Sequence, residues 1–112
     1  MMYNQGDIVI IKFPFSDLPE VKKRPALVIS NDKVNCTGDY LLVQITSKIK
    51  NDGLSFKLSP EDFVNNKSLP LESYIRLHKI FLLNSNLILS KATSIKDVCL
   101  SEITKNIIKL IN

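Results

Sequence analysis

The sequence predicts a mainly β protein with minor α content: a small, strongly curved antiparallel sheet or barrel closed by one carboxy-terminal helix. Short segments rich in β-branched and aromatic residues follow one another as far as Ile95, separated by turn residues. After Asp97 the apolar residues change to a helical spacing. The chain has 112 residues, 45% hydrophobic and 23% charged, which predicts one domain over residues 1–112.

The first two expected strands are joined by a polar loop. Residues 7–13 are mostly β-branched or aromatic, and the strand should end there because Pro14 cannot donate to a ladder. Residues 16–24 form the loop. Pro25 fits at the beginning of the second strand, which we expect over residues 26–30. This strand is apolar on both faces, which favours a central place in the sheet.

Two more strands are expected in the middle of the chain. Residues 31–32 and 35–39 carry turn chemistry, and a third strand should follow over residues 40–46. A further turn at residues 50–53 leads to a short fourth strand over residues 55–58.

A helical turn and two strands complete the expected sheet. Residues 59–62 combine an N-cap serine, a proline at the first helical position and two acids in the first turn. Residues 73–82 alternate well enough for a long strand. A turn at residues 85–86 separates it from a last short strand within residues 88–95.

The tail from Asp97 onward is expected to form the helix, with Asp97 as its N-cap. One helical stripe holds Cys99, Ile103, Ile107, Leu110 and Ile111, and Val98, Leu100 and Ile108 broaden it. This apolar stripe predicts packing of the helix against the sheet.

Charge and cysteine content limit the classes of function. Lysine plus arginine exceed aspartate plus glutamate by 15 to 11, and the net charge of +4 favours nucleic acid or acidic protein segments as partners. Cys36 and Cys99 lie far apart without a Cys-x-x-Cys pair, so we expect two reduced, mostly buried thiols and neither a zinc site nor a disulfide framework. No signal peptide or membrane-spanning segment is recognisable, which predicts a cytoplasmic protein.

Missing motifs argue against several kinds of enzyme. His78 is the single histidine of the sequence and has no nucleophile motif nearby, which disfavours a triad hydrolase. The chain has 3 glycines and no glycine-rich phosphate loop, so we expect no nucleotide cofactor. Its aspartates are scattered through separate turns, which predicts no metal centre.

The remaining candidate site is a group of cations at the start of the second strand. Lys22, Lys23 and Arg24 directly precede Pro25, and Thr46 ends the third strand. A guanidinium can bind two phosphate oxygens while a nearby threonine hydroxyl donates to a third, and such a pair can stabilise a pentacoordinate phosphorane without a metal. By themselves these residues also fit an ordinary surface charge and an ordinary β-branched strand residue.

Four motifs recur in the order known from one protein family. They are Gly-Asp-Ile-Val-x-x-x-Phe-Pro-Phe-Ser-Asp at residues 6–17, Lys-Arg-Pro-Ala-Leu-Val-Ile-Ser at 23–30, Gln-Ile-Thr-Ser at 44–47 and Ser-Tyr-Ile-Arg at 73–76. Together they resemble the MazF/PemK toxins of bacterial type II toxin–antitoxin systems, and the resemblance covers nearly the whole chain.

This resemblance implies an SH3-like barrel with a carboxy-terminal helix, a homodimer, and metal-independent cleavage of single-stranded RNA, often messenger RNA. Cleavage in that family uses the substrate's own 2′-hydroxyl and leaves a 2′,3′-cyclic phosphate and a 5′-hydroxyl, so DNA should be spared. The implied protein partner is an antitoxin that lays an extended, acidic segment across the basic groove. No cofactor is implied.

The resemblance also assigns residues. Arg24 matches the catalytic arginine, which stabilises the transition-state charge and takes part in proton transfer, and Thr46 matches the threonine that orients the scissile phosphate. The candidate RNA-binding residues are Ser47, Ser73, Arg76 and Lys79, with Lys22 and Lys23 as steering charges. The motif at residues 13–15 (Phe-Pro-Phe) implies a core or loop-anchoring role. The loop at residues 16–23 gates the groove in relatives and varies among them, so the target sequence does not transfer.

Two alternatives on the same fold remain open. A CcdB-like toxin poisons DNA gyrase without being an enzyme, through a carboxy-terminal tail that contains tryptophan; this chain has no tryptophan, and its last residues, 109–112, are Lys-Leu-Ile-Asn. A catalytically idle module on this fold would bind RNA without cutting it.

Overall fold

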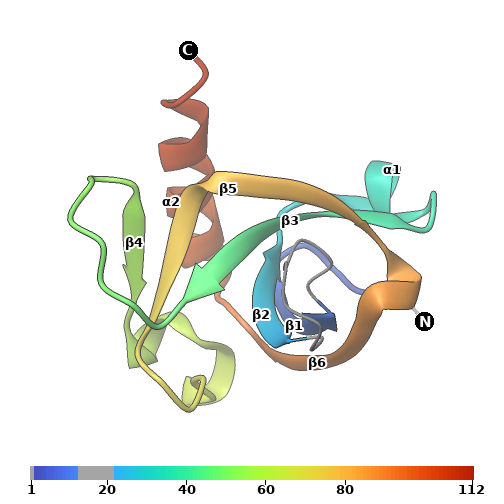
Figure 1. The fold of residues 1–112 in the computed structure, drawn as a ribbon, viewed down its shortest axis with the longest axis horizontal. Helices are drawn as coiled ribbons and strands as arrows, with labels where there is room; N and C mark the ends of the chain where they lie inside the picture. Colours follow the sequence, from blue (N-terminus) through green and yellow to red (C-terminus); the bar gives the residue numbers. More distant parts are fainter. Residues whose placement is uncertain (1, 13–21) are drawn as a thin grey trace.

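The computed structural model of the chain describes residues 2–12 and 22–112 (Figure 1). Within these ranges the strands are β1 (Asp7–Lys12), β2 (Lys23–Val28), β3 (Asp39–Thr46), β4 (Ser55–Leu58), β5 (Ser73–Asn84) and β6 (Ile88–Ser94). The helices are α1 (Asp32–Asn35) and α2 (Asp97–Ile108), and the short 3₁₀ turns are η1 (Pro60–Asp62), η2 (Val64–Asn66) and η3 (Ser85–Leu87). The predicted mainly β fold with a carboxy-terminal helix is confirmed.

The described strands form one antiparallel sheet in the order β4-β5-β3-β2-β1-β6. In Figure 1 the sheet curls strongly: β5 arches over β3, and β6 passes below β1 and β2. Among the described residues β4 and β6 are the edge strands, and an isolated bridge between Phe63 and Ile95 joins the segments that follow them. The strongly curved sheet is therefore found, but no β4–β6 ladder closes it into a barrel.

Side chains on both faces of the sheet are buried, as the apolar sequence of the second strand predicts. In β2, Leu27 packs in a cluster that includes Ile103 of α2, whereas Ala26 and Val28 pack in a second cluster. Because alternate strand residues point to opposite faces, the two clusters lie on the two sides of the sheet. The predicted central position of this strand is confirmed, since β2 pairs with β1 on one side and with β3 on the other.

The limits of several strands differ from the predicted ones. The second strand begins at Lys23 and ends at Val28, so the prediction of residues 26–30 is wrong at both ends. Pro25 is tolerated inside it because pairing with β3 begins at Ala26, and β1 alone pairs with Pro25. The long strand β5 continues two residues beyond the expected end, to Asn84.

The short helical segments follow from local capping. The turn expected at residues 31–32 is instead the start of α1, because the Asn31 side chain accepts a hydrogen bond from the Lys33 N–H at 3.0 Å. The predicted helical turn at residues 59–62 is confirmed as η1, and the Ser59 N–H donates to a carboxylate oxygen of Asp62 at 2.8 Å.

Helix α2 differs from the prediction at both ends. Lys96 is the N-cap and Asp97 is the first helical residue, so the prediction of Asp97 as the cap is wrong; its negative charge still lies in the first turn, where it is favourable. Leu110 and Ile111 follow the end of the helix and are exposed, so they do not continue the buried stripe. Val98 is exposed as well.

Part of the predicted first loop lies outside the described residues. This concerns the last residue of the expected first strand, the motif at residues 13–15 and the loop positions 16–21. In the part of the chain that is described, no helix is both long enough and apolar enough to cross a membrane.

Candidate functional site

A groove of about 940 Å³ lies where β2 begins and β3 ends. Its other walls come from the β3–β4 connection, from residues 69–71 and from β5. All eight predicted site residues line this groove: Lys22, Lys23, Arg24, Thr46, Ser47, Ser73, Arg76 and Lys79. The fold therefore brings together residues that lie up to 57 positions apart in the sequence.

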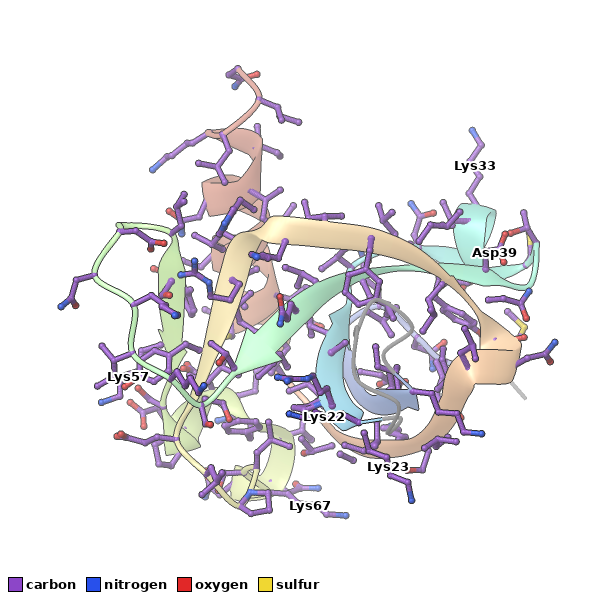
Figure 2. The ribbon with its side chains drawn as sticks, viewed as in Figure 1. Lys22, Lys23, Lys33, Asp39, Lys57 and Lys67 are labelled. Atoms are coloured by element: carbon purple, nitrogen blue, oxygen red, sulfur yellow. The ribbon has the colours of Figure 1, made fainter. Side chains whose placement is uncertain are left out.

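The groove is strongly cationic. Asp52 is the single acidic side chain among its described lining residues, whereas seven lysine and arginine residues line it. These cations are Lys22, Lys23, Arg24, Lys48, Lys50, Arg76 and Lys79. Figure 2 shows Lys22 and Lys23 near the start of β2, well separated from Lys33 on α1. A concave surface lined by one sign of charge attracts anions and raises their local concentration.

Arg24 and Thr46 reach the groove from neighbouring strands. The β2–β3 register pairs Val28 with Leu42 and Ala26 with Gln44. Ala26 and Gln44 are the paired residues nearest the groove, and Arg24 and Thr46 each lie two residues further along, so they share the face of these residues. Both side chains are half-buried. Arg24 and Thr46 therefore both line the groove, close to the end of the β2–β3 pairing.

The Thr46 hydroxyl is oriented by the backbone that follows it. Its oxygen accepts a hydrogen bond from the Lys48 N–H at 3.2 Å. A hydroxyl that accepts in this way still has its own proton to donate. Thr46 can therefore donate a hydrogen bond to an anion in the groove while its oxygen is held by the main chain.

Arg76 lines the groove, but its guanidinium is bound to protein. Its two terminal nitrogens donate to the two carboxylate oxygens of Asp52 at 3.0 and 2.7 Å, and one of them also donates to the Ser55 hydroxyl at 2.7 Å. These hydrogen bonds hold the pKa of the Asp52 carboxyl well below its usual range, with the Leu54 N–H adding to the effect, and raise the pKa of Arg76. The carboxylate occupies the donor pair that would otherwise bind a phosphate.

The other predicted binding residues divide into two groups. Ser73 is buried, and its hydroxyl donates to the Leu71 carbonyl at 2.8 Å, so this side chain already has a main-chain acceptor. The remaining four are exposed to solvent where they line the groove: Lys22, Lys23, Ser47 and Lys79.

Three charged residues of the groove were not among the predicted site residues: Lys48, Lys50 and Asp52. The two lysines come soon after the third strand, within four residues of Thr46. Their closeness to Thr46 in the sequence was the signal that could have identified them. Asp52 gave no such signal, because Asp52 and Gly53 fit an ordinary turn. Its carboxylate in fact accepts from the Leu54 N–H at 3.1 Å, as turn aspartates do, while also binding Arg76.

Metal-ligating residues do not gather in the described part of the chain. Within residues 2–12 and 22–112 no group of three or more His, Cys, Asp or Glu side chains could hold a metal ion. His78 is exposed and does not line the groove. The chemistry that these residues offer is therefore that of fixed cations and hydroxyl donors acting on an anion.

Comparison with protein families gives one match over almost the entire sequence. Residues 4–111 match the family described as PemK-like, MazF-like toxin of type II toxin–antitoxin system. A comparison with curated proteins gives no match.

Solved structures share the fold at low sequence identity. MazF from Deinococcus radiodurans aligns with a TM-score of 0.78 and 19% identity, covering 99% of this chain and 97% of that one. A MazE–MazF structure from the same organism gives 0.77 and 19%, covering 99% and 96%. An endoribonuclease in complex with its cognate antitoxin, from a mycobacterial species, gives 0.76 and 16%, covering 97% and 94%. At these identities the likeness shows a common fold.

Proposed function

Because the chain belongs to the family of PemK-like, MazF-like toxins of type II toxin–antitoxin systems, we propose that it is a metal-independent endoribonuclease acting on single-stranded RNA. Its substrate in the cell is messenger RNA, cut at a short sequence in the cytoplasm. The cationic groove is the RNA site, and the phosphate to be cleaved lies between Arg24 and Thr46.

The proposed reaction uses a nucleophile that the RNA itself carries. The 2′-hydroxyl loses its proton to solvent as its oxygen attacks the adjacent phosphorus, and the bond from phosphorus to the 5′-oxygen breaks. The leaving 5′-oxygen takes up a proton from solvent, so the products end in a 2′,3′-cyclic phosphate and a 5′-hydroxyl. Negative charge builds up on the phosphoryl oxygens as the pentacoordinate phosphorane forms. Arg24 neutralises this charge with its guanidinium, and Thr46 donates its hydroxyl proton as a hydrogen bond to the same group.

The strongest support for this proposal is the register of β2 and β3. The paired residues nearest the groove are Ala26 and Gln44, two positions from Arg24 and Thr46, and both of these side chains line a site with seven cations. Donors held by a sheet need no rearrangement as charge develops, which is the condition for electrostatic stabilisation of a transition state. Since DNA lacks the 2′-hydroxyl, the same site should bind DNA without cutting it.

We also propose a protein partner and an assembly. The toxin is neutralised by a cognate antitoxin whose extended acidic segment occupies the cationic groove, and it acts as a homodimer. The antitoxin is supported by the charge of the groove, because an acidic segment competes directly with RNA phosphates for the same lysines.

Incubation of the purified protein with RNA in EDTA tests the proposal. Cleavage should proceed in the chelator, leave cyclic phosphate ends, and stop at a site whose nucleotide is replaced by its 2′-deoxy form. Arg24→Ala should abolish it. RNA binding without cleavage would instead favour an idle RNA-binding module, and inhibition of gyrase supercoiling would favour a CcdB-like poison.

A further inference from the structure

We propose that Asp52 and Arg76 form a latch that holds residues 47–54 as a rigid wall of the groove, so that both act as positioning residues for RNA. The effect of the latch on RNA binding rests on the proposed function. The latch itself rests on the hydrogen bonds between Asp52 and Arg76. In this proposal Arg76 positions the groove wall and does not bind phosphate. The proposal also explains why an acidic residue, Asp52, lies in a cationic groove.

The latch joins the end of the β3–β4 connection to β5 through four hydrogen bonds. Arg76 donates two to Asp52 and one to Ser55, at 2.7 to 3.0 Å. The fourth is between backbones, from the Leu77 N–H to the Leu54 carbonyl at 2.9 Å. The Arg76 side chain is 8% exposed, whereas that of Asp52 is 42% exposed. An arginine buried in this way depends on its carboxylate partner, because an unpaired buried guanidinium is costly.

The strand register brings Arg76 to this position. In the β4–β5 ladder Arg76 pairs with Ser55, so the arginine lies opposite the first residue of β4, close to the end of the β3–β4 connection. On the other side of β5 the pairing is irregular: Val43 pairs with Ile80, but Ile45 pairs with Ile75, so Gln44 alone lies opposite residues 76–79. Extra residues of this kind bend a strand. Arg76 and Lys79 lie at the two ends of this irregular stretch, and both line the groove.

The held segment carries two exposed cations, Lys48 and Lys50, into the groove. It is fixed at its start by the hydrogen bond from the Lys48 N–H to Thr46 and at its end by the latch. Without the latch the segment would be tied to the sheet at Thr46 and by main-chain pairing alone. Ordering it on RNA binding would then cost affinity, which preorganisation avoids.

A simpler role for Asp52 makes the opposite prediction. If Asp52 only reduced the positive charge of the groove, Asp52→Asn would improve RNA binding, and Arg76→Gln would weaken it. If the two form a latch, both substitutions release the same segment, and both weaken binding although they change the charge in opposite directions. The sign of the effect of Asp52→Asn therefore separates the two roles.

The chain contains a matched control pair. Lys57 and Glu72 form a surface ion pair at 3.2 Å, with side chains 55% and 68% exposed, and neither lines the groove. Lys57 belongs to β4, and Figure 2 shows it away from Lys22 and Lys23. Glu72→Gln and Lys57→Gln change the net charge as Asp52→Asn and Arg76→Gln do, but they leave the latch intact.

The experiment measures the cleavage of a short RNA, and the hydrogen exchange of residues 47–54, for the wild type, the two single latch variants, their double variant and the two controls. Asp52→Asn and Arg76→Gln should each raise KM by about 3- to 10-fold with kcat within about 2-fold, because binding is lost and the reacting groups remain. The KM of the double variant should be no higher than that of the single variant with the larger effect, because both substitutions break the same contact. Exchange in residues 47–54 should become faster in these variants and stay unchanged in both controls.

A milder variant and an independent readout keep the outcome decisive. Ser55→Ala removes one of the Arg76 contacts and should give an intermediate KM, which covers the case in which Arg76→Gln fails to fold. A lower KM for Asp52→Asn, or unchanged exchange in residues 47–54, would overturn the latch. If the wild type cuts no RNA, the proposed function fails, whereas the exchange measurement still decides whether the latch exists.

Discussion

In the proposed reaction Arg24 and Thr46 divide the chemistry of the groove at the level of single residues. The guanidinium supplies permanent charge, and the hydroxyl supplies a donor whose oxygen accepts from the Lys48 N–H. The distinction matters for substitution, since the proposed role gives Thr46 two partners: the substrate through its proton, and the backbone through its lone pair.

Thr46→Val keeps the shape of the side chain and removes the hydroxyl. The cleavage rate constant at saturating RNA should fall by about 10²–10³-fold, the usual loss for one fixed donor to a developing oxyanion. Thr46→Ser, which retains the hydroxyl, should stay within about tenfold of the wild type. Thr37→Val, a matched change at an exposed position near α1, should have no effect. Single-turnover cleavage in EDTA measures all four proteins, and wild-type rates for Thr46→Val would refute the assigned role.

The two cysteines should react very differently. Burial raises the pKa of the Cys99 thiol to about 12, and the nearby Asp62 and Glu102 carboxylates add to the effect. At pH 8 such a thiol is roughly 10⁻⁴ thiolate. Cys36 is exposed, so the expectation of a buried thiol is wrong for this residue and holds for Cys99. Titration with a disulfide reagent should find one thiol in the native protein and two in urea. Cys36→Ser should leave no fast-reacting thiol; rapid modification of Cys99 in the folded state would contradict this.

Residue chemistry explains why the site was predictable in part. The strand-end position of Thr46 follows from the chain pattern, because turn residues come soon after it. Arg24 was expected in the loop before the second strand, but it lies within β2, opposite Ile11 of β1. The contacts of Arg76 did not follow from the motif Ser-Tyr-Ile-Arg, because they depend on the β4–β5 register, which sets Arg76 opposite Ser55, and on the position of Asp52 in the preceding turn.

At the level of elements, α2 covers one face of the sheet with a narrow apolar stripe. Cys99, Ile103 and Ile107 are its buried residues, spaced by four. The sequence predicted this face of the helix but not its length. Leu110 and Ile111 continue the apolar spacing, yet the helix ends at Ile108. Periodicity marks which residues share a face; it does not say how far the sheet extends beneath them.

Ile103→Ala tests how much this packing stabilises the fold. Ile103 is 0% exposed, and its truncation should lower the free energy of unfolding by about 2–5 kcal/mol through lost burial and a remaining cavity. Val98, on the same helix, is 81% exposed, and Val98→Ala should change stability by less than about 0.5 kcal/mol. Urea unfolding followed by circular dichroism gives both values. Equal effects of the two substitutions would mean that α2 does not pack as described.

At the level of the whole molecule, charge is concentrated where the fold is concave. The chain has 15 lysines and arginines, and seven of them line the groove. The net charge of +4 therefore underestimates the positive potential in the groove. Among the described residues, the acidic side chains other than Asp52 do not line it. Composition alone favoured a nucleic acid or an acidic partner weakly. The fold adds support to this expectation, because it gathers cations from β2, the β3–β4 connection and β5 into one groove.

This concentration of charge predicts a steep and dissectible salt dependence. Arg76 and Asp52 neutralise each other, which leaves at most six groove cations to replace counterions on single-stranded RNA. The slope of the logarithm of the RNA-binding constant against the logarithm of the salt concentration should be no steeper than about −4, since each contact contributes about 0.7.

Fluorescence anisotropy with Thr46→Val protein measures binding without cleavage. In that background Lys22→Gln should reduce the slope by about 0.7, whereas Lys33→Gln, on the distant helix α1, should leave it unchanged. Equal slopes for the two variants would mean that RNA binds a surface other than the groove.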